Sequence, residues 1–97
     1  MDLRYIDPRE LRVPPSRAEG ADLFKLQQQI ARFGASAAGM PPIWAYEILD
    51  GSLLIVNGVT RAIRIAKLAP GVTVPVEVIG RLSRQGFADP KVEDYLS

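Results

Sequence analysis

The sequence contains neither cysteine nor histidine, and this absence limits its chemistry strongly. Without these two residues the chain has no thiol nucleophile, no imidazole base and none of the usual side chains of a zinc site. Disulfide bonds are excluded as well, so the sequence gives no indication of the redox state of its compartment. Any catalysis would rest on carboxylates, hydroxyls, arginine or lysine, with magnesium as the metal that oxygen ligands hold.

A long hydrophobic run is also missing. No apolar stretch approaches the ~20 residues that a membrane-spanning helix needs, and Met1-Asp2-Leu3 is not the start of a signal peptide. We therefore expect a cytoplasmic protein with no membrane partner. The 97 residues, 47% apolar and 24% charged, predict one soluble globular domain. A net charge of +1 gives no overall attraction to nucleic acid.

The segment Leu53–Ala69 predicts a strand that leads directly into a helix. Leu53 to Val56 is a short apolar run typical of a buried strand, and Asn57-Gly58 ends it. From Thr60 the apolar residues recur at helical spacing. A helix that begins after a glycine turn presents unpaired N–H groups and a positive dipole end, which favour a bound anion, phosphate above all.

The other elements follow from caps, turns and spacing. Asp22 and Gly34 are typical helix caps, and they predict an amphipathic helix from Leu23 to about Phe33 whose core face is Leu23, Leu26, Ile30 and Phe33. Asp50-Gly51 predicts a tight hairpin, and Pro75 predicts that its strand lies at an edge or a bulge. Strands are expected at Leu3–Ile6, Ile43–Leu49 and Val72–Ile79, with a short extended segment at Glu10–Val13.

Together these elements predict an α/β (α+β) fold, a small mixed sheet packed by two main helices. We expect one domain over residues 1–80, followed by a polar tail over residues 81–97. In this tail, Asp89-Pro90 predicts the start of a short helix that ends at Leu96.

The order of these elements resembles the ParB/sulfiredoxin-like superfamily over roughly residues 3 to 79. The resemblance lies in a Pro-rich turn ending in Arg17, a helix ending in Gly34, a Pro-Pro-Ile strand, the Asp-Gly hairpin, the Ile-Val-Asn-Gly run with its x-x-Arg helix, and a Val-Pro-Val strand. It implies the fold of the ParB N-terminal domain. In that superfamily the residues after the turn glycine bind nucleotide phosphates or act in phosphotransfer or phosphate hydrolysis.

Carried onto this sequence, the resemblance implies phosphate or nucleotide binding by Arg17, Gly58, Thr60 and Arg61. Val59 stands where ParB proteins have a glutamate and sulfiredoxins a cysteine, so sulfiredoxin chemistry is excluded and hydrolysis by the usual residue is put in doubt. Thr60 keeps a hydroxyl where the family has Arg or His. No residue can be named as catalytic, and no metal ligand is predicted.

Each of these residues has a second interpretation. Gly58 can serve a positive φ or a close backbone approach rather than a phosphate. Arg61 can pair with Asp50 or Glu77 instead of an anion. Arg64 and Lys67 lie away from the apolar arc of their helix, which favours a solvated face over a contact with nucleic acid.

The remaining candidates are carboxylates and aromatics. A base or a metal ligand would have to come from Asp7, Glu10, Glu47 or Asp50, and Asp50 is better explained by its turn. Trp44 and Tyr46 point the same way from their strand, which favours core packing or a partner interface over stacking on a base.

The sequence thus leaves three functions open. The first is a phosphate or nucleotide site, with a nucleoside triphosphate and magnesium as the expected ligand and hydrolysis undecided. The second is a non-catalytic module that uses Arg61, Arg64 and Lys67 for DNA, or Trp44 and Tyr46 for a protein partner. The third is a ParB-type nuclease or toxin domain, against which the missing acidic cluster argues.

Overall fold

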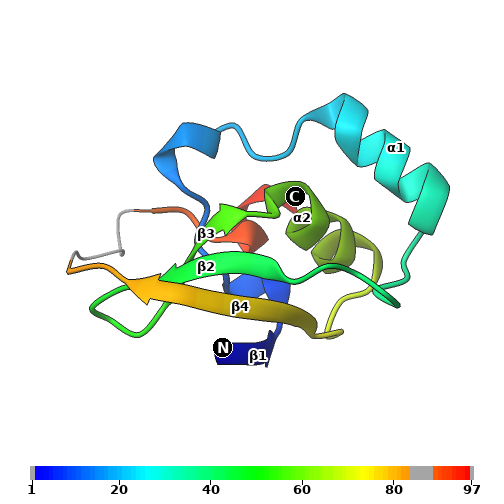
Figure 1. Cartoon of the computed structure of the whole chain (residues 1–97). Coiled ribbons are helices and arrows are strands. Elements are labelled where there is room, and N and C mark those ends of the chain that lie inside the picture. The colour runs from blue at the N-terminus through cyan, green and yellow to red at the C-terminus, as the bar shows by residue number, and fades with distance from the viewer. Residues whose placement is uncertain (1, 84–88, 97) are drawn as a thin grey trace.

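The computed structural model describes residues 2–83 and 89–96 and confirms a mixed α+β fold (Figure 1). In this part of the chain, four strands form one sheet: β1 (Asp2–Ile6), β2 (Ile43–Glu47), β3 (Leu53–Asn57) and β4 (Val74–Arg81). The α-helices are α1 (Leu23–Phe33) and α2 (Val59–Leu68). Three short 3-10 helices are η1 (Pro8–Glu10), η2 (Pro15–Arg17) and η3 (Val92–Tyr95). None of the described helices is long and apolar enough to span a membrane.

The sheet has the strand order β1-β4-β2-β3. The outer pairs β1–β4 and β2–β3 are antiparallel, whereas β2 and β4 are parallel. A parallel pair needs a crossover connection, and the hairpin strand β3 together with α2 supplies it. The crossover carries the strand-to-helix junction at Gly58, so the sheet topology fixes where α2 begins.

The prediction that Pro75 places its strand at an edge is wrong, and the irregularity that this strand does contain lies away from Pro75. β4 lies between β1 and β2, and its register irregularity falls at Ile79. Pro75 is tolerated because it pairs only with Tyr5 of β1, one residue before Val76 meets Ile43 of β2. The missing N–H therefore falls at the end of the central ladder, where it disturbs the fewest hydrogen bonds.

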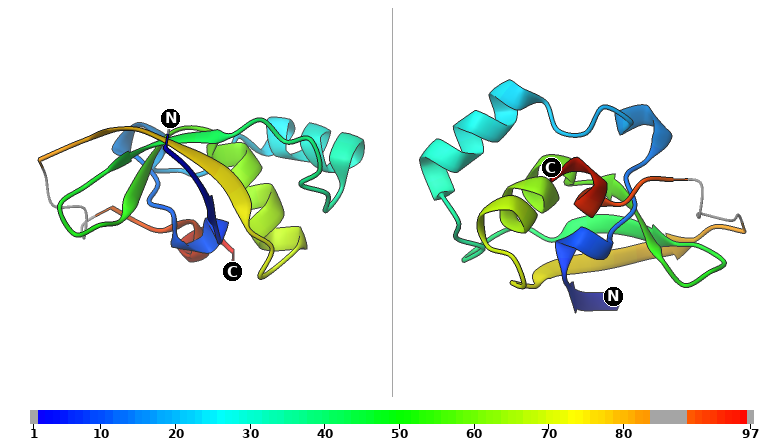
Figure 2. Two further views of the ribbon diagram at one scale, coloured as in Figure 1. Left: turned by 60° about the horizontal axis from the view of Figure 1, so that its bottom comes forward. Right: turned by 180° about the vertical axis from the view of Figure 1, so that it is seen from behind.

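The core lies between one face of the sheet and α2. The side chains of Ile43, Ala45, Val74 and Val76 are fully buried on the sheet side. α2 is buried over most of its surface because it contacts α1, η1 and η3 as well as β2. Figure 2 shows α2 on one side of the sheet, with α1, η1 and η3 around it.

Helix α1 has the predicted boundaries but only part of the predicted core face. The Asp22 carboxylate caps it by accepting a hydrogen bond from the Lys25 N–H at 3.1 Å, and Gly34 ends it with a φ of 57°. Leu26 is buried and Ile30 half-buried, whereas Leu23 is 74% exposed and Phe33 48% exposed. The reason is that α1 packs along α2 rather than over the sheet, so only a narrow strip of it is covered (Figure 1).

The segment 89–96, which the sequence assigns to a polar tail, contributes to the core. Val92 is fully buried, and η3 packs against η1 and α2 (Figure 2). The Val92 N–H donates to the Leu11 carbonyl and the Val13 N–H to the Pro90 carbonyl, both at 2.8 Å. The segment expected to be extended at Glu10–Val13 is therefore hydrogen-bonded to segment 89–96 at Leu11 and Val13, whereas Glu10 belongs to η1. The expected helix is present as the 3-10 helix η3.

Candidate anion-binding cleft

The junction between β3 and α2 has the predicted form. β3 ends at Asn57, and Gly58 turns the chain with a φ of 118° and a ψ of 19°. The first N–H with a partner inside the helix is that of Ala62, which donates to the Gly58 carbonyl at 2.9 Å. No side chain of the described residues caps this helix end. The N–H groups before Ala62 therefore have no acceptor within the helix, and the positive dipole end is open.

Gly58 is required by close contacts as well as by its positive φ. A Cβ at this position would lie 2.9 Å from a terminal nitrogen of Arg61 and 2.9 Å from Cγ1 of Ile43. The absence of a side chain thus lets the Arg61 guanidinium lie directly beside the first turn of its own helix. Gly58 therefore has the conformational role considered from the sequence, a positive φ and a close backbone approach. The lack of a side chain at this position also leaves room for a cation at the helix end.

A cleft of about 380 Å³ opens at this junction. Its lining residues come from η2, from α1 and from the amino end of α2. All four residues predicted for phosphate or nucleotide binding line it: Arg17, Gly58, Thr60 and Arg61. The structure therefore brings together predicted residues from two separate parts of the chain, η2 and the start of α2.

Four further lining residues are not predicted as binding residues from the sequence: Lys25, Gln29, Asn57 and Val59. Lys25 and Gln29 are four residues apart on α1, so they share one face of that helix. This spacing is visible in the sequence, but it does not say that the face is turned toward the start of α2. Asn57 is predicted only as the end of a strand.

The charged residues that line the cleft in the described part of the chain, Arg17, Lys25 and Arg61, are all cations. Arg61 is half-buried and donates one hydrogen bond, at 3.2 Å, to the carbonyl of Pro41. Among the described residues, no carboxylate lies within ion-pair distance of its guanidinium, so the predicted alternatives Asp50 and Glu77 do not pair with it. Burial lowers the pKa of Arg61 below its ordinary value, yet an arginine stays charged at neutral pH. The charged side chains that line the cleft in the described part of the chain are therefore of one sign, and the carboxylates of Glu19 and Asp22 line the adjoining pocket that shares Arg17 and Lys25.

Thr60 and Val59 differ in what they offer to the cleft. Thr60 is 7% exposed and lines the cleft, so its hydroxyl is within the candidate site. Val59 is 2% exposed and its side chain belongs to the hydrophobic core. The position that the ParB/sulfiredoxin resemblance associates with a glutamate or cysteine thus carries a packing residue here.

The prediction that Arg64 lies on a solvated face is wrong. Its side chain is buried between α2 and α1, and the residue is 3% exposed. The cause is a set of carbonyl acceptors and an aromatic ring at the C-terminal end of α1, which surround the guanidinium. Lys67 is exposed as predicted. Of these two residues considered for nucleic acid, only Lys67 presents its charge on the surface.

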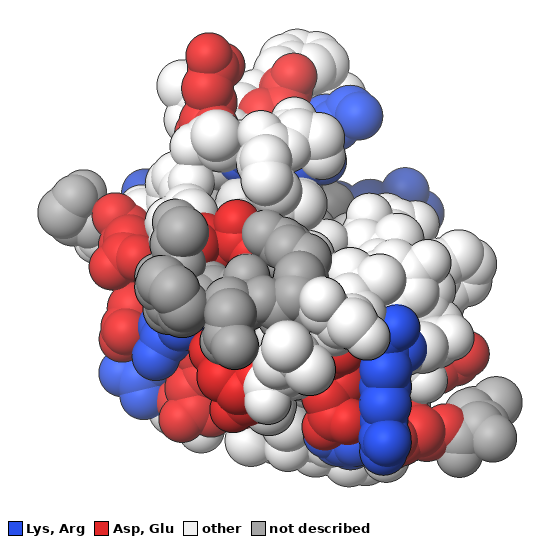
Figure 3. Space-filling view, turned by 90° about the vertical axis from the view of Figure 1, so that its left-hand side faces the viewer, with Lys and Arg blue, Asp and Glu red and all other residues white. Residues whose placement is uncertain are grey.

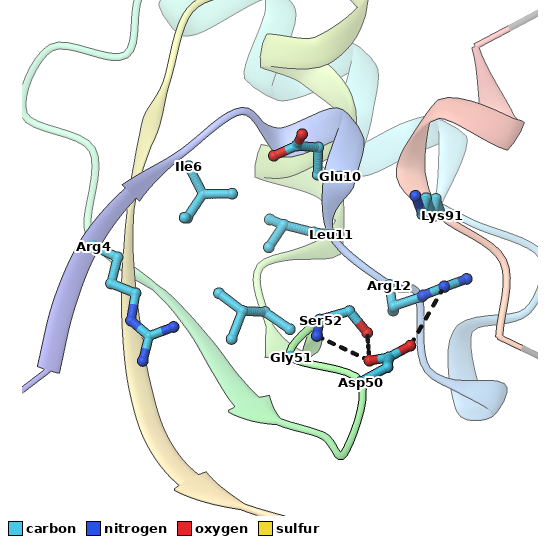
Figure 4. A pocket seen from close by; sticks show the side chains of 10 residues that line it. Arg4, Ile6, Glu10, Leu11, Arg12, Asp50, Gly51, Ser52 and Lys91 are labelled. Carbon is cyan, nitrogen blue, oxygen red and sulfur yellow. Dashed lines mark hydrogen bonds and ion pairs between the residues drawn. The ribbon is translucent and has the colours of Figure 1, made fainter. Parts of the chain in front are cut away.

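The carboxylates considered for catalysis lie outside the cleft. Asp7 pairs with Arg9, and Glu47 pairs with Arg4 and Arg81. Glu10 and Asp50 line a different pocket of about 400 Å³ between β1 and the hairpin (Figure 4).

In that pocket the Asp50 carboxylate accepts hydrogen bonds from the N–H and hydroxyl of Ser52, which confirms its turn role. These bonds lower the pKa of Asp50 below its usual value. Within residues 2–83 and 89–96, no cluster of three carboxylates could hold a metal ion.

The aromatic pair on β2 does not form an exposed stacking platform. Trp44 is 47% exposed on the sheet face that α2 leaves uncovered. The Tyr46 ring instead lies against Gly80, whose added Cβ would come within 3.1 Å of it. At the hairpin end of the molecule, acidic and basic side chains are interleaved (Figure 3). This mixture contrasts with the single sign of charge that lines the cleft.

Comparisons with protein-family models, with curated proteins and with solved structures find no match for this chain. The resemblance to the ParB/sulfiredoxin-like superfamily therefore stays a prediction from the sequence. The function must be argued from the geometry of the cleft.

Proposed function

We propose that this domain binds a phosphate-bearing ligand, such as a nucleoside triphosphate with magnesium, at the amino end of α2. The observation that carries the proposal is the convergence of Arg17, Lys25 and Arg61 on one cleft whose described lining residues include no carboxylate. Helix N–H groups that lack acceptors lie at the same place, and they favour negative charge for an independent reason.

In this proposal the residues of the first turn of α2 have distinct roles. The N–H groups of Val59, Thr60 and Arg61 would donate to phosphate oxygens, as at other helix N-termini. The Thr60 hydroxyl and the Arg61 guanidinium would donate to the same oxygens, since both residues line the cleft. Arg17 and Lys25 would contact a second phosphate group across the cleft. Three cations favour a ligand with several negative charges over a singly charged one.

The proposal is binding rather than hydrolysis. A general base must be within hydrogen-bond reach of the water it activates, and the lining residues within the described part of the chain include no carboxylate. Asp7, Glu10 and Asp50 belong to other parts of the surface.

Thermal unfolding with and without ligand tests the proposal. A ligand at about a hundred times its Kd stabilises a fold by about 2.7 kcal/mol, which for a domain of this size raises Tm by about 10–20 °C. We expect such a rise with a nucleoside triphosphate and magnesium or with inorganic triphosphate, and its loss in Arg61→Ala. Lys67→Ala is the matched control, because it removes an exposed cation of the same helix outside the cleft.

Two results would contradict the proposal. One is the absence of any shift with all of these ligands. The other is an equal shift in the wild-type protein and in Arg61→Ala. Binding of DNA that is weakened by Lys67→Ala, with a steep dependence on salt, would support the DNA-binding alternative instead.

A further inference from the structure

The guanidinium of Arg64 is buried beside the cleft but does not line it. Its Nη1 donates to the carbonyls of Gly34 and Ser36, both at 2.8 Å, and its Nε donates to Oε1 of Gln29 at 3.3 Å. Its Cζ lies 5.4 Å from the centre of the Phe33 ring. All of these partners belong to α1 or to the loop that follows it.

The groups that accept hydrogen bonds from Arg64 are carbonyl oxygens without a formal charge, so they only partly offset the desolvation of the guanidinium. Among the described residues, no carboxylate pairs with Arg64, and burial lowers its pKa. An apolar side chain of similar size would fill this space at a lower desolvation cost. Unlike an apolar side chain, the planar guanidinium donates several hydrogen bonds in fixed directions, so it holds several acceptors in place at once.

Helix α1 has few other attachments. All residues of this helix are described, and among them only Leu26 is buried. The helix packs mainly against α2. The same helix carries Lys25 and Gln29 into the cleft, and Gln29 both lines the cleft and accepts the hydrogen bond from Arg64. The position of these two side chains therefore depends on how α1 is held.

We propose that Arg64 is a positioning residue for the cleft: it fixes α1 against α2 so that Lys25 and Gln29 face the amino end of α2. This inference rests on the proposed function. Arg61 and Arg64 are three residues apart on α2 and are neighbours on its surface. The first guanidinium serves the ligand directly, and the second sets the opposite wall of the cleft.

A double-mutant cycle on ligand affinity tests this role, with inorganic triphosphate as the probe and calorimetry as the readout. Lys25→Ala should weaken binding about tenfold in the wild-type background, because a hydrogen bond to a charged group is lost. Arg64→Met should weaken binding by a similar factor. In the Arg64→Met background, Lys25→Ala should have little further effect, because Lys25 is already misplaced.

A purely structural role would give a different pattern. Arg64→Met would then lower Tm while Lys25→Ala kept its full effect, so the two changes would be additive, and the inference would be overturned. Arg64→Lys should restore part of the affinity, since an ammonium keeps the charge without the fork. If Arg64→Met does not fold, the same cycle is run with Arg64→Gln, which removes the guanidinium fork and keeps a polar group in its place. The matched control is Arg32→Met, an exposed arginine beside the same Phe33 ring, which should leave affinity unchanged.

The failure of this inference is distinguishable from that of the proposed function. If wild-type protein does not bind triphosphate, or if Arg61→Ala binds it equally well, the cleft itself is wrong and both proposals fall. If Arg61→Ala abolishes binding while the cycle between Lys25 and Arg64 is additive, the cleft stands and only the positioning role is overturned.

Discussion

Replacing Gly58 with alanine would test the junction on which the candidate site is built. At a φ of 118° an L side chain is strained, which costs about 1–3 kcal/mol. The new Cβ would also lie 2.9 Å from Arg61 and 2.9 Å from Ile43. The Arg61 guanidinium is the end of a long side chain and can move away. Ile43 is fully buried and cannot, so overpacking adds about 1–3 kcal/mol.

Replacing glycine with alanine also reduces the conformational entropy of the unfolded chain, but this stabilises the folded state by only about 0.4–1 kcal/mol. We therefore expect Gly58→Ala to lose about 1–6 kcal/mol, and the middle of this range, about 3 kcal/mol, corresponds to a fall in Tm of about 12–24 °C for a domain of this size. Thermal unfolding followed by circular dichroism or calorimetry measures it. Because Arg61 is displaced as well, the variant should also lose the stabilisation by triphosphate.

Gly71→Ala is the matched control. Gly71 has a φ of 89°, and a Cβ added there would meet no heavy atom within 4 Å among the described residues. This position therefore has the strain of a positive φ without the close contact. If Gly58→Ala were as stable as Gly71→Ala, the close approach of Ile43 and Arg61 would be refuted, and with it the placement of the guanidinium at the helix end.

Three further predictions concern stability. Asp22→Ala removes the cap of α1 and should cost about 0.5–2 kcal/mol in chemical denaturation. Val92→Ala should cost about 2 kcal/mol, because Val92 is fully buried, whereas a solvated tail would show no effect. Hydrogen bonds from Ser52 to Asp50 and from Arg9 to Asp7 hold the pKa of both carboxyls below the usual value in the folded state. The stabilisation by these carboxylates is present above their pKa in the unfolded chain and is lost as the pH falls through their lower pKa in the folded state, so acid unfolding should be less steep in Asp50→Asn.

Elements marked by local signals could be predicted from the sequence. The boundaries of α1 follow from Asp22 and Gly34, whose capping roles need no tertiary contact. The hairpin at Asp50-Gly51 and the turn at Gly58 are likewise set by residues that adopt turn geometry locally. The helix N-terminus, and with it Thr60 and Arg61, could be predicted because it is defined by its own few residues.

Features that depend on distant contacts could not be predicted. β4 is central because β1 pairs with its other edge, and nothing near Pro75 indicates that pairing. Arg64 has a polar position on its helix and is buried only because α1 packs over it. Lys25 lines the cleft because α1 packs on α2, and this tertiary contact has no local signal in the sequence.

An NMR titration of the labelled protein with inorganic triphosphate, and then with a nucleoside triphosphate and magnesium, tests the central claim most directly. We predict that the amide signals of Val59, Thr60 and Arg61 shift first and most, together with that of Lys25 across the cleft. Amide signals that do not move at saturating ligand, or shifts confined to Lys67 and the exposed end of α2, would contradict an anion site at the amino end of this helix.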